Sequence, residues 1–438
     1  MATKKSVFDL PWRLKLVVFS LLMSEFVRSL GYNLYTISLP LLAQSLTTST
    51  VLVGLAISMF GFVNASTQLS FGKFSDKHGR RGILLVTAFI YAGGALLVSL
   101  SDNIYEFIFF RGVQAVGALM SVLQACLGDI FPPERRGTAM AWFSIVYAIG
   151  TIVGLPLGIV VAGLINLRMP FYVGAALAFI SAGILVVFLR ETHPTRQGTP
   201  VSALGQENKS PMMTNGDPVP VPVLASQAVP GNAVMPVPMP SLHSIKGFIP
   251  ACIVGMLVNA VPGAFFAFAP TWLESLKFTI LDMIWIFIPG IAIFFCGAFL
   301  SGVLSDRLGR KRPVVFGLCL GAPCALLIPP LSGVTVIGMI PFVMLMMLGV
   351  AIAQPPLSAL VLDLVDKSIR GRATGIYNTL TIFGNASGAL LAGVVASTLL
   401  GVDAIFLLAA CLLAFGIVLG QVFMPDKGTS KGLKRVTS

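Results

Sequence analysis

The chain has 438 residues, of which 56% are hydrophobic and 11% are charged, and its mean hydropathy is +0.91. Soluble domains average about 25% charged residues, so this composition excludes an ordinary soluble protein and indicates one embedded in a lipid bilayer. The formal net charge is +12, but the Lys and Arg residues lie mostly at the two ends and in alternate loops, not in one basic cluster. This distribution argues against a nucleic-acid partner and predicts cytoplasmic termini in a cell (inner) membrane.

Hydrophobic segments recur along the chain, and each is long enough to cross a bilayer as a helix, which takes about 20 apolar residues. Lipid supplies no hydrogen bonds, so each spanning segment must satisfy its own backbone as a helix. We therefore predict an all-α integral membrane protein with 12 transmembrane helices. The predicted spans are 14–43, 51–72, 82–101, 106–128, 137–164 and 171–190, then 247–275, 280–302, 313–332, 335–362, 373–400 and 402–424.

The first span carries a carboxylate near the middle of the predicted bilayer. Glu25 lies about 16 Å into the span at 1.5 Å per residue, and an acid at that depth costs about 2.5–3.5 kcal/mol on insertion scales. Arg28, Tyr32 and Tyr35 follow at helical spacing, so the four side chains share one face. Either this stripe lines a cavity and binds a proton or the substrate, or Glu25 and Arg28 form a pair that only neutralises two buried charges.

The loop after the second span combines glycines, an acid and arginines. Its glycines permit a tight turn, and Asp76 is placed to cap a helix N-terminus, where the helix dipole favours an anion. Its two arginines can pair with Asp129 at the end of the fourth span. The loop either makes these specific contacts or is only a basic segment that orients the helices. The candidate residues in it are Gly72, Asp76, Gly79, Arg80 and Arg81.

The fourth span contains a polar pair, Arg111 and Gln114, in an otherwise apolar helix. Arg111 lies near the outer end of the span, so it could extend to the membrane surface. The corresponding position in the second half of the chain is Leu345. This asymmetry favours a specific role for Arg111 and Gln114 in binding the substrate or the proton.

The fifth span contains small residues four apart, Gly150 and Gly154, followed by Pro156. Small residues at this spacing let two membrane helices approach closely. A proline inside a helix frees a backbone carbonyl and can bend the helix. We therefore assign these three residues to helix packing.

Residues 191–246 are rich in proline and poor in charge, which is typical of an extended linker. A tether is the simpler interpretation, and a binding segment is the alternative. The six cysteines lie in apolar runs without a Cys-x-x-Cys pair, and the three histidines lie in loop or linker positions. We therefore expect no metal site and no cofactor.

Two repeated motifs indicate an internal duplication. The loop at 72–81 recurs at 302–311, where Asp306 and Arg310 occupy the matching positions, and the segment from Asp129 to Gly137 recurs at 363–371. We predict an N-terminal six-helix bundle at 1–190, a cytoplasmic linker at 191–246, and a C-terminal six-helix bundle at 247–438. Tandem halves of this kind alternate access by rocking about a central site.

These loops resemble the hallmark Gly-x-x-x-Asp-x-x-Gly-Arg-Arg/Lys loop of the major facilitator superfamily, and the patterns in spans four and five are closest to its twelve-span drug:proton antiporter group. The resemblance implies alternating access. It also implies that both copies of the loop, together with Asp129, form a cytoplasmic gate. In that gate Asp76, Asp129 and their partners latch the cytoplasmic side, with the start of span eleven facing the loop. Span four departs from the family pattern by having Ala115 for a glycine, and span five by placing Pro156 one residue late.

We therefore expect a secondary active transporter. The favoured interpretation is a proton-coupled exporter (an antiporter) that moves a small amphipathic molecule, and we expect a monomer. Its partners would be that substrate, protons and the lipid bilayer. An importer or facilitator of a sugar, organic acid or chelated metal is an alternative. Another is a non-transporting receptor or scaffold that acts through the linker. The sequence offers no nucleophile–base–acid set and no ATP-binding loop, so we do not expect an enzyme.

Overall fold

In the computed structural model, the described residues are 12–118, 120–131, 135–189, 245, 247–332, 336–366 and 369–425. The predicted linker and both chain ends therefore lie outside them, apart from Ile245. The described residues of the first half form eight helices. They are α1 (Trp12–Leu34), α2 (Ser38–Leu46), α3 (Thr50–His78), α4 (Arg80–Leu100), α5 (Ile104–Val116), α6 (Met120–Ile130), α7 (Arg136–Leu164) and α8 (Met169–Phe188).

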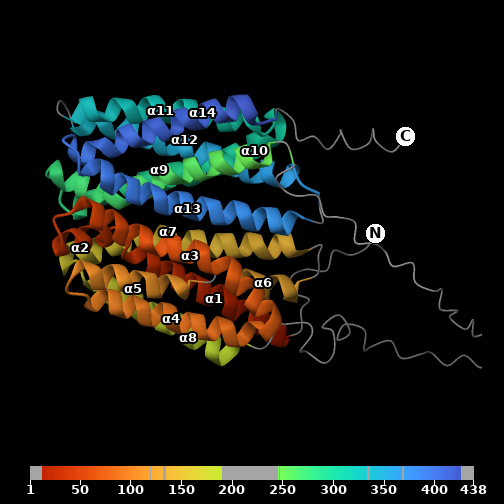
Figure 1. Ribbon diagram of the computed structural model, residues 1–438. Helices are drawn as coiled ribbons and strands as arrows, with labels where there is room; N and C mark the ends of the chain where they lie inside the picture. Colours follow the sequence, from red (N-terminus) through yellow and green to blue (C-terminus); the bar gives the residue numbers. More distant parts are fainter. Residues whose placement is uncertain are drawn as a thin grey trace, which may run out of the picture.

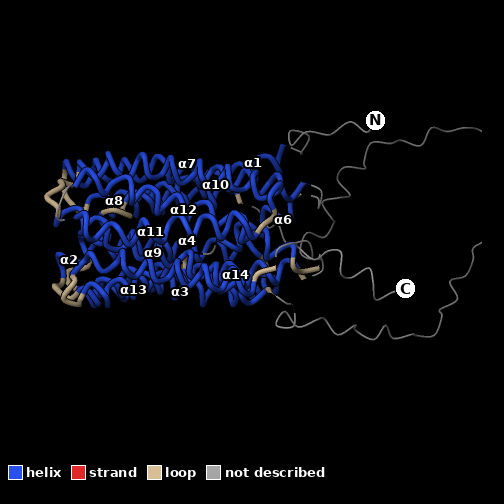
Figure 2. Tube along the Cα trace, turned by 90° about the horizontal axis from the view of Figure 1, so that it is seen from above, coloured by secondary structure: helices blue, strands red, loops and turns tan. Residues whose placement is uncertain are grey.

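The described residues of the second half form six α-helices and two short 3-10 turns, which lie beside the first half as a separate bundle (Figure 1). The axes of the long helices in both bundles are roughly aligned, as the view from above also shows (Figure 2). The elements are α9 (Phe248–Ser275), η4 (Leu281–Met283), α10 (Ile284–Leu308), α11 (Lys311–Ser332), α12 (Val336–Asp363), α13 (Arg370–Ala396), η5 (Gly401–Asp403) and α14 (Ala404–Phe423).

Ten segments in the described part of the chain are long and apolar enough to cross a membrane on their own. The other two predicted spans are each divided into a helix pair, α1 with α2 and α5 with α6. The all-α fold is therefore confirmed, and ten of the 12 predicted spans meet this criterion in the described residues. We call the end of the molecule where α1 begins the proximal end, and the end where α2 finishes the distal end.

The break in the first span has a local cause. Pro40 is the third residue of α2, and a proline cannot donate to the carbonyl four residues earlier and collides with it. That carbonyl belongs to Thr36, which lies in the turn at Tyr35–Ile37. The helix of the predicted span at 14–43 is therefore interrupted at this turn, which begins at Tyr35, the last tyrosine of the span.

The break in the fourth span is a site of close helix contact. A Cβ atom at Gly117 would collide with the backbone of Tyr91 in α4, so only glycine allows this approach. The break frees backbone carbonyls, and the Asn64 side chain of α3 donates to those of Ala118 at 2.8 Å and Ala115 at 3.4 Å. These hydrogen bonds replace the ones that helix continuity would have supplied inside the membrane.

The duplication is visible in the backbone. Gly79 and Gly309, which end α3 and α10, have φ values of +96° and +84°, a region that favours glycine. The packing repeats as well. Gly154 of α7 lies against the Leu30 carbonyl of α1, and Gly388 of α13 lies against a carbonyl of α9 in the same way.

The described contacts between the two halves gather toward the distal end. Gln44 of α2 donates to the hydroxyl of Thr271 in α9, and the Thr50 hydroxyl of α3 donates to the Gly393 carbonyl of α13 at 2.9 Å. Further along the same contact, α3 packs on α13, and Phe62 and Phe383 meet with ring centres 5.1 Å apart. The halves are therefore held together at the distal end.

Candidate functional site

A cavity of about 600 Å³ lies between the two halves. This size falls within the range of ligand pockets, about 300–1,000 Å³. Both halves contribute to its wall. From the first half come Arg28, Tyr32, Asn33, Tyr35, Thr36, Asn64, Gln68, Arg111, Tyr147 and Thr151, and from the second come Asn259, Phe265, Phe266, Phe287, Phe294, Gln354 and Asn385, among others.

The first half supplies a strong ion pair beside this cavity. Arg28 contacts the Glu25 carboxylate with two nitrogens, Nε to Oε2 at 2.9 Å and Nη2 to Oε1 at 2.6 Å. Glu25 is 0% exposed and the Arg28 side chain is 16% exposed. Arg28 lines the cavity while Glu25 does not, so the carboxylate lies behind the arginine as seen from the cavity. The structure therefore agrees with both interpretations of the polar stripe. Glu25 and Arg28 form a neutralising pair, and Arg28 also lines the cavity.

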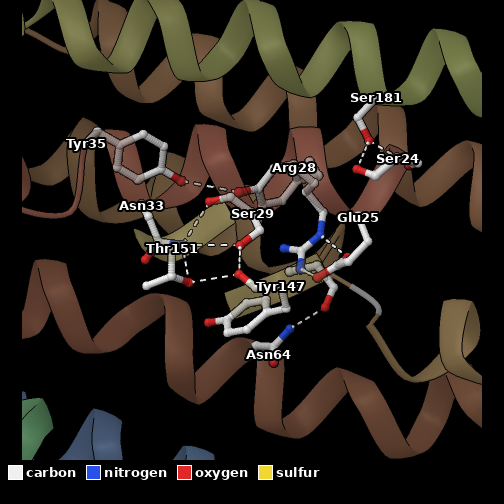
Figure 3. Close-up of polar contacts among 12 residues, drawn as sticks. Ser24, Glu25, Arg28, Ser29, Asn33, Tyr35, Asn64, Tyr147, Thr151 and Ser181 are labelled. Carbon is white, nitrogen blue, oxygen red and sulfur yellow. Dashed lines mark hydrogen bonds and ion pairs between the residues drawn. The ribbon is translucent and has the colours of Figure 1, made fainter. Parts of the chain in front are cut away.

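Arg28 is held from a second side. Its guanidinium carbon lies 5.8 Å from the centre of the Tyr91 ring in α4, a distance at which a cation attracts the ring face. Figure 3 shows the guanidinium between Glu25 and Tyr147 of α7. The remaining nitrogen, Nη1, has no hydrogen-bond partner among the described residues. It is the part of Arg28 that a molecule in the cavity can engage.

A second buried network extends from Arg111 of α5. Its Nη1 donates to Gln114 at 2.7 Å, Gln114 donates to the Tyr35 hydroxyl at 2.9 Å, and that hydroxyl lies 3.3 Å from the Tyr91 hydroxyl. Arg111 is 1% exposed and stacks over Phe60 at 4.6 Å. It therefore points into the protein and does not extend to the membrane surface. The two arginines are joined through side chains of α1, α4 and α5.

The helix α1 is fixed against α7 by further polar contacts (Figure 3). The Ser29 hydroxyl donates to the Tyr147 carbonyl at 3.0 Å, and Asn33 donates to the Ser29 carbonyl at 2.8 Å and to the Thr151 hydroxyl at 3.1 Å. Gly150 and Gly154, which were predicted to serve helix packing, lie on this contact, and Pro156 lies inside α7 two residues after Gly154. The helix that carries Arg28 is therefore held against α7 by polar contacts and by close packing.

The second half presents a different face to the cavity. Phe265, Phe266 and Phe287 form an aromatic cluster with ring centres 5.6–6.3 Å apart. Beside this cluster lie two amide side chains, and Gln354 donates a hydrogen bond to the Asn259 side chain at 3.2 Å. The cavity thus offers charge and hydroxyls on one side, and aromatic surface with neutral amides on the other.

Residues predicted to form the cytoplasmic gate make ion pairs at the proximal end within each half. Arg80 lies 2.8 Å from the Asp129 carboxylate, and Arg310 lies 3.0 Å from Asp363 and also contacts Asp306. Burial alone would lower the pKa of Arg310. The hydrogen bonds that Arg310 donates to the Asp363 and Asp306 carboxylates outweigh this effect and raise the pKa, so the arginine stays charged.

The remaining gate residues are placed less completely. Arg81 is exposed at the start of α4. Gly72 and Asp76 belong to α3, but their surroundings lie outside the described residues. The expected contact between Asp76 and the start of span eleven therefore stays a prediction.

Sequence reasoning missed several residues of the site. Tyr91, Phe60, Tyr147 and Asn64 were not among the predicted site residues, although they lie beside Arg28, beside Arg111 or on the cavity wall. One signal was available: Thr87 and Tyr91 lie four apart in a helix that is otherwise apolar, which puts them on one face. That this face meets Arg28 depends on how α4 packs on α1.

The Major Facilitator Superfamily model matches residues 21–381 and 339–437. Multidrug resistance protein 2 of Bacillus subtilis (strain 168) is 24% identical over 425 residues, covering 96% of this chain and 98% of that protein. Inner membrane transport protein YajR of Escherichia coli (strain K12) is 31% identical over 147 residues, so that match spans 33% of this chain and 32% of YajR.

Among solved structures, a bacterial homolog of the human lysosomal transporter Spinster, in an inward-facing and unoccupied conformation, has a TM-score of 0.74 at 14% identity, covering 96% of this chain and 99% of that one. At this identity the likeness establishes the fold. Together with the family match it identifies a multi-pass membrane transporter and not an enzyme. The chain belongs to the Major Facilitator Superfamily.

Proposed function

We propose that this transporter is a proton-coupled exporter, an antiporter that moves a small amphipathic molecule out of the cell across the inner membrane. The observation that carries the proposal is the buried Glu25–Arg28 pair, in which Arg28 also lines the central cavity. The outward direction is supported by the relative named Multidrug resistance protein 2, which aligns along nearly the whole chain. With the predicted cytoplasmic termini, the proximal end faces the cytoplasm.

The pair offers a physical route for coupling. A proton on Glu25 removes the negative charge that holds Arg28. The positive charge of Arg28 at the cavity wall is then no longer balanced. A cationic cargo is then repelled, and a neutral cargo must compete with the released guanidinium for the same space. Proton binding and cargo binding therefore oppose each other, as antiport requires. Each proton that moves inward contributes about 2.3 kcal/mol per 100 mV of membrane potential.

The test uses purified protein in vesicles with an imposed pH gradient, and a panel of cationic, neutral and anionic amphipathic fluorescent dyes as cargo probes. Wild type should concentrate at least one dye against its gradient. Glu25→Gln keeps the shape of the side chain but cannot bind a proton, so it should lose uphill transport while exchange of dye across the membrane continues.

The matched control is Glu274→Gln, since Glu274 is an exposed acid near the distal end of α9. This variant should transport like wild type. Uphill transport by Glu25→Gln at the wild-type rate would contradict the proposal.

One observation favours a second candidate function, proton-linked uptake of an organic acid. Arg28 and Arg111 line the cavity, and no Asp or Glu is among the described residues of its wall. An anion that draws Arg28 away from Glu25 would favour protonation of Glu25, so anion and proton would bind together and move in one direction. The dye panel separates the two functions, because only this candidate moves an anionic dye with the protons.

A further inference from the structure

The first half contains a second, much smaller chamber behind α1. Its volume is about 30 Å³, and it is lined from α1, α4, α6, α8 and the break between α5 and α6. Glu25 is part of its wall, although Glu25 takes no part in the wall of the central cavity. The carboxylate therefore faces a compartment of its own.

The chamber has the size and the chemistry to hold water. A water molecule needs about 10–15 Å³ of such space and two to four polar partners. Besides Glu25, the wall contains the side chains of Thr87, Tyr91, Ser24 and Ser181. The Ser24 and Ser181 hydroxyls lie 2.7 Å apart and form a polar corner of the wall (Figure 3).

The two compartments are joined through one side chain. Arg28 lines the central cavity and also the chamber, and no other described residue lines both. Its Nε and Nη2 atoms hold Glu25, and its Nη1 atom is the nitrogen left for the central cavity. A change in the charge of Glu25 can therefore reach the cargo through the position of Arg28.

We propose that the chamber is a hydrated proton-binding site, separate from the cargo cavity, in which one or two water molecules connect Glu25 to the Tyr91 hydroxyl. The inference rests on the proposed proton coupling and assigns it a location. Proton and cargo then do not compete for the carboxylate. They are linked because Arg28 is shared.

The proposed proton transfer in the chamber conserves atoms and charge. A protonated water in the chamber gives its proton to a Glu25 oxygen, an O–H bond forms there, and neutral water remains. The Glu25–Arg28 ion pair loses its negative partner. The other charged or titratable groups that face this pair are Tyr91 from α4 and Tyr147 from α7, while the described residues of α6 and α8 that line the chamber carry no ionisable side chain.

The experiment measures how fast water reaches Glu25 in the purified full-length protein without cargo. The infrared carbonyl band of protonated Glu25, identified by its loss in Glu25→Gln, shifts when its proton exchanges in D2O. In wild type this shift should finish within seconds. Ala88→Leu fills the chamber, since Ala88 lies on its wall, and should slow the exchange at least tenfold.

A second variant keeps the test decisive if Ala88→Leu fails to fold. Thr87→Val keeps the volume and removes a hydroxyl from the chamber wall, so it should slow the exchange by a smaller factor. Val86→Leu is the matched control on the same helix, because Val86 is 60% exposed on the outer face of the bundle. Its exchange should equal that of wild type.

Two results would overturn the proposal of a hydrated chamber. One is exchange of the Glu25 proton over hours in wild type, and the other is exchange at the wild-type rate in a folded Ala88→Leu protein. Either result leaves the proposed function intact if Glu25→Gln still loses uphill transport. Conversely, slow exchange in Ala88→Leu together with full uphill transport by Glu25→Gln would keep the hydrated chamber and reject the proposed function.

Discussion

At the scale of single residues, the central feature is a salt bridge whose two members have different surroundings. Glu25 is fully buried in the first half, whereas Arg28 reaches the space between the halves. Burying two charges is costly, and a buried pair often contributes little net stability even though losing one member is strongly destabilising. The proposed function gives this pair a role in which its charge changes.

We therefore predict strong energetic coupling between the two side chains. Arg28→Met leaves a buried carboxylate without its partner and should lower stability in detergent by about 3–5 kcal/mol. Adding Glu25→Gln should restore a large part of this loss, and thermal unfolding of the four proteins gives the coupling energy as a double-mutant cycle.

The control for this cycle is Arg168→Met, because Arg168 pairs at 3.2 Å with Asp102, whose side chain is 84% exposed. Exposed pairs contribute about 0–1 kcal/mol, so this variant should be nearly neutral. Additive effects of Arg28→Met and Glu25→Gln would contradict the account of the pair.

At the scale of the helices, backbone contact through glycine positions the site. Along α7, Gly150, Gly154 and Gly158 face α1 so closely that a Cβ atom at each would press on Ser29, Leu30 or Leu34. The sequence predicted packing for the first two of these glycines from their spacing. It did not predict that the partner is the helix that carries Arg28, because spacing describes one helix and the partner is chosen by the whole bundle.

Gly158→Ala tests this contact. The added methyl group would meet the Leu34 carbonyl, and overpacking of this kind costs about 1–3 kcal/mol, so the melting temperature in detergent should fall. Gly183→Ala in α8 is the control, since a Cβ atom there has nothing within 4 Å. That variant should be neutral or slightly more stable, because alanine favours a helix over glycine by about 0.5–1 kcal/mol. Equal melting temperatures for the two variants would contradict the packing argument.

The sequence predicted the helices and the pair better than it predicted the surroundings of the pair. Glu25 and Arg28 are three residues apart, so helical geometry alone brings them together. The broken first span escaped prediction because Pro40 lies within an unbroken apolar run. Tyr91 and Asn64 escaped because their roles arise from contacts between helices distant in the sequence, which no periodic pattern records.

At the scale of the whole molecule, a duplicated fold carries an asymmetric site. Both halves share the glycine turns at Gly79 and Gly309 and the proximal ion pairs. The buried charges beside the cavity lie in the first half, and the second half faces them with aromatic rings and amides. Under the proposed function, rocking of the two similar halves would expose the cavity to either side, and the proton would bind in the first half.

The most direct test of this account is to follow protons while cargo flows. Vesicles are loaded with a transported dye and a pH indicator, without an initial pH gradient, and the dye is allowed to leave down its own gradient. The account predicts that the vesicle interior becomes acidic with wild-type protein and stays unchanged with Glu25→Gln. Equal acidification in both proteins, or an interior that becomes alkaline as the dye leaves, would contradict proton antiport through the Glu25–Arg28 pair.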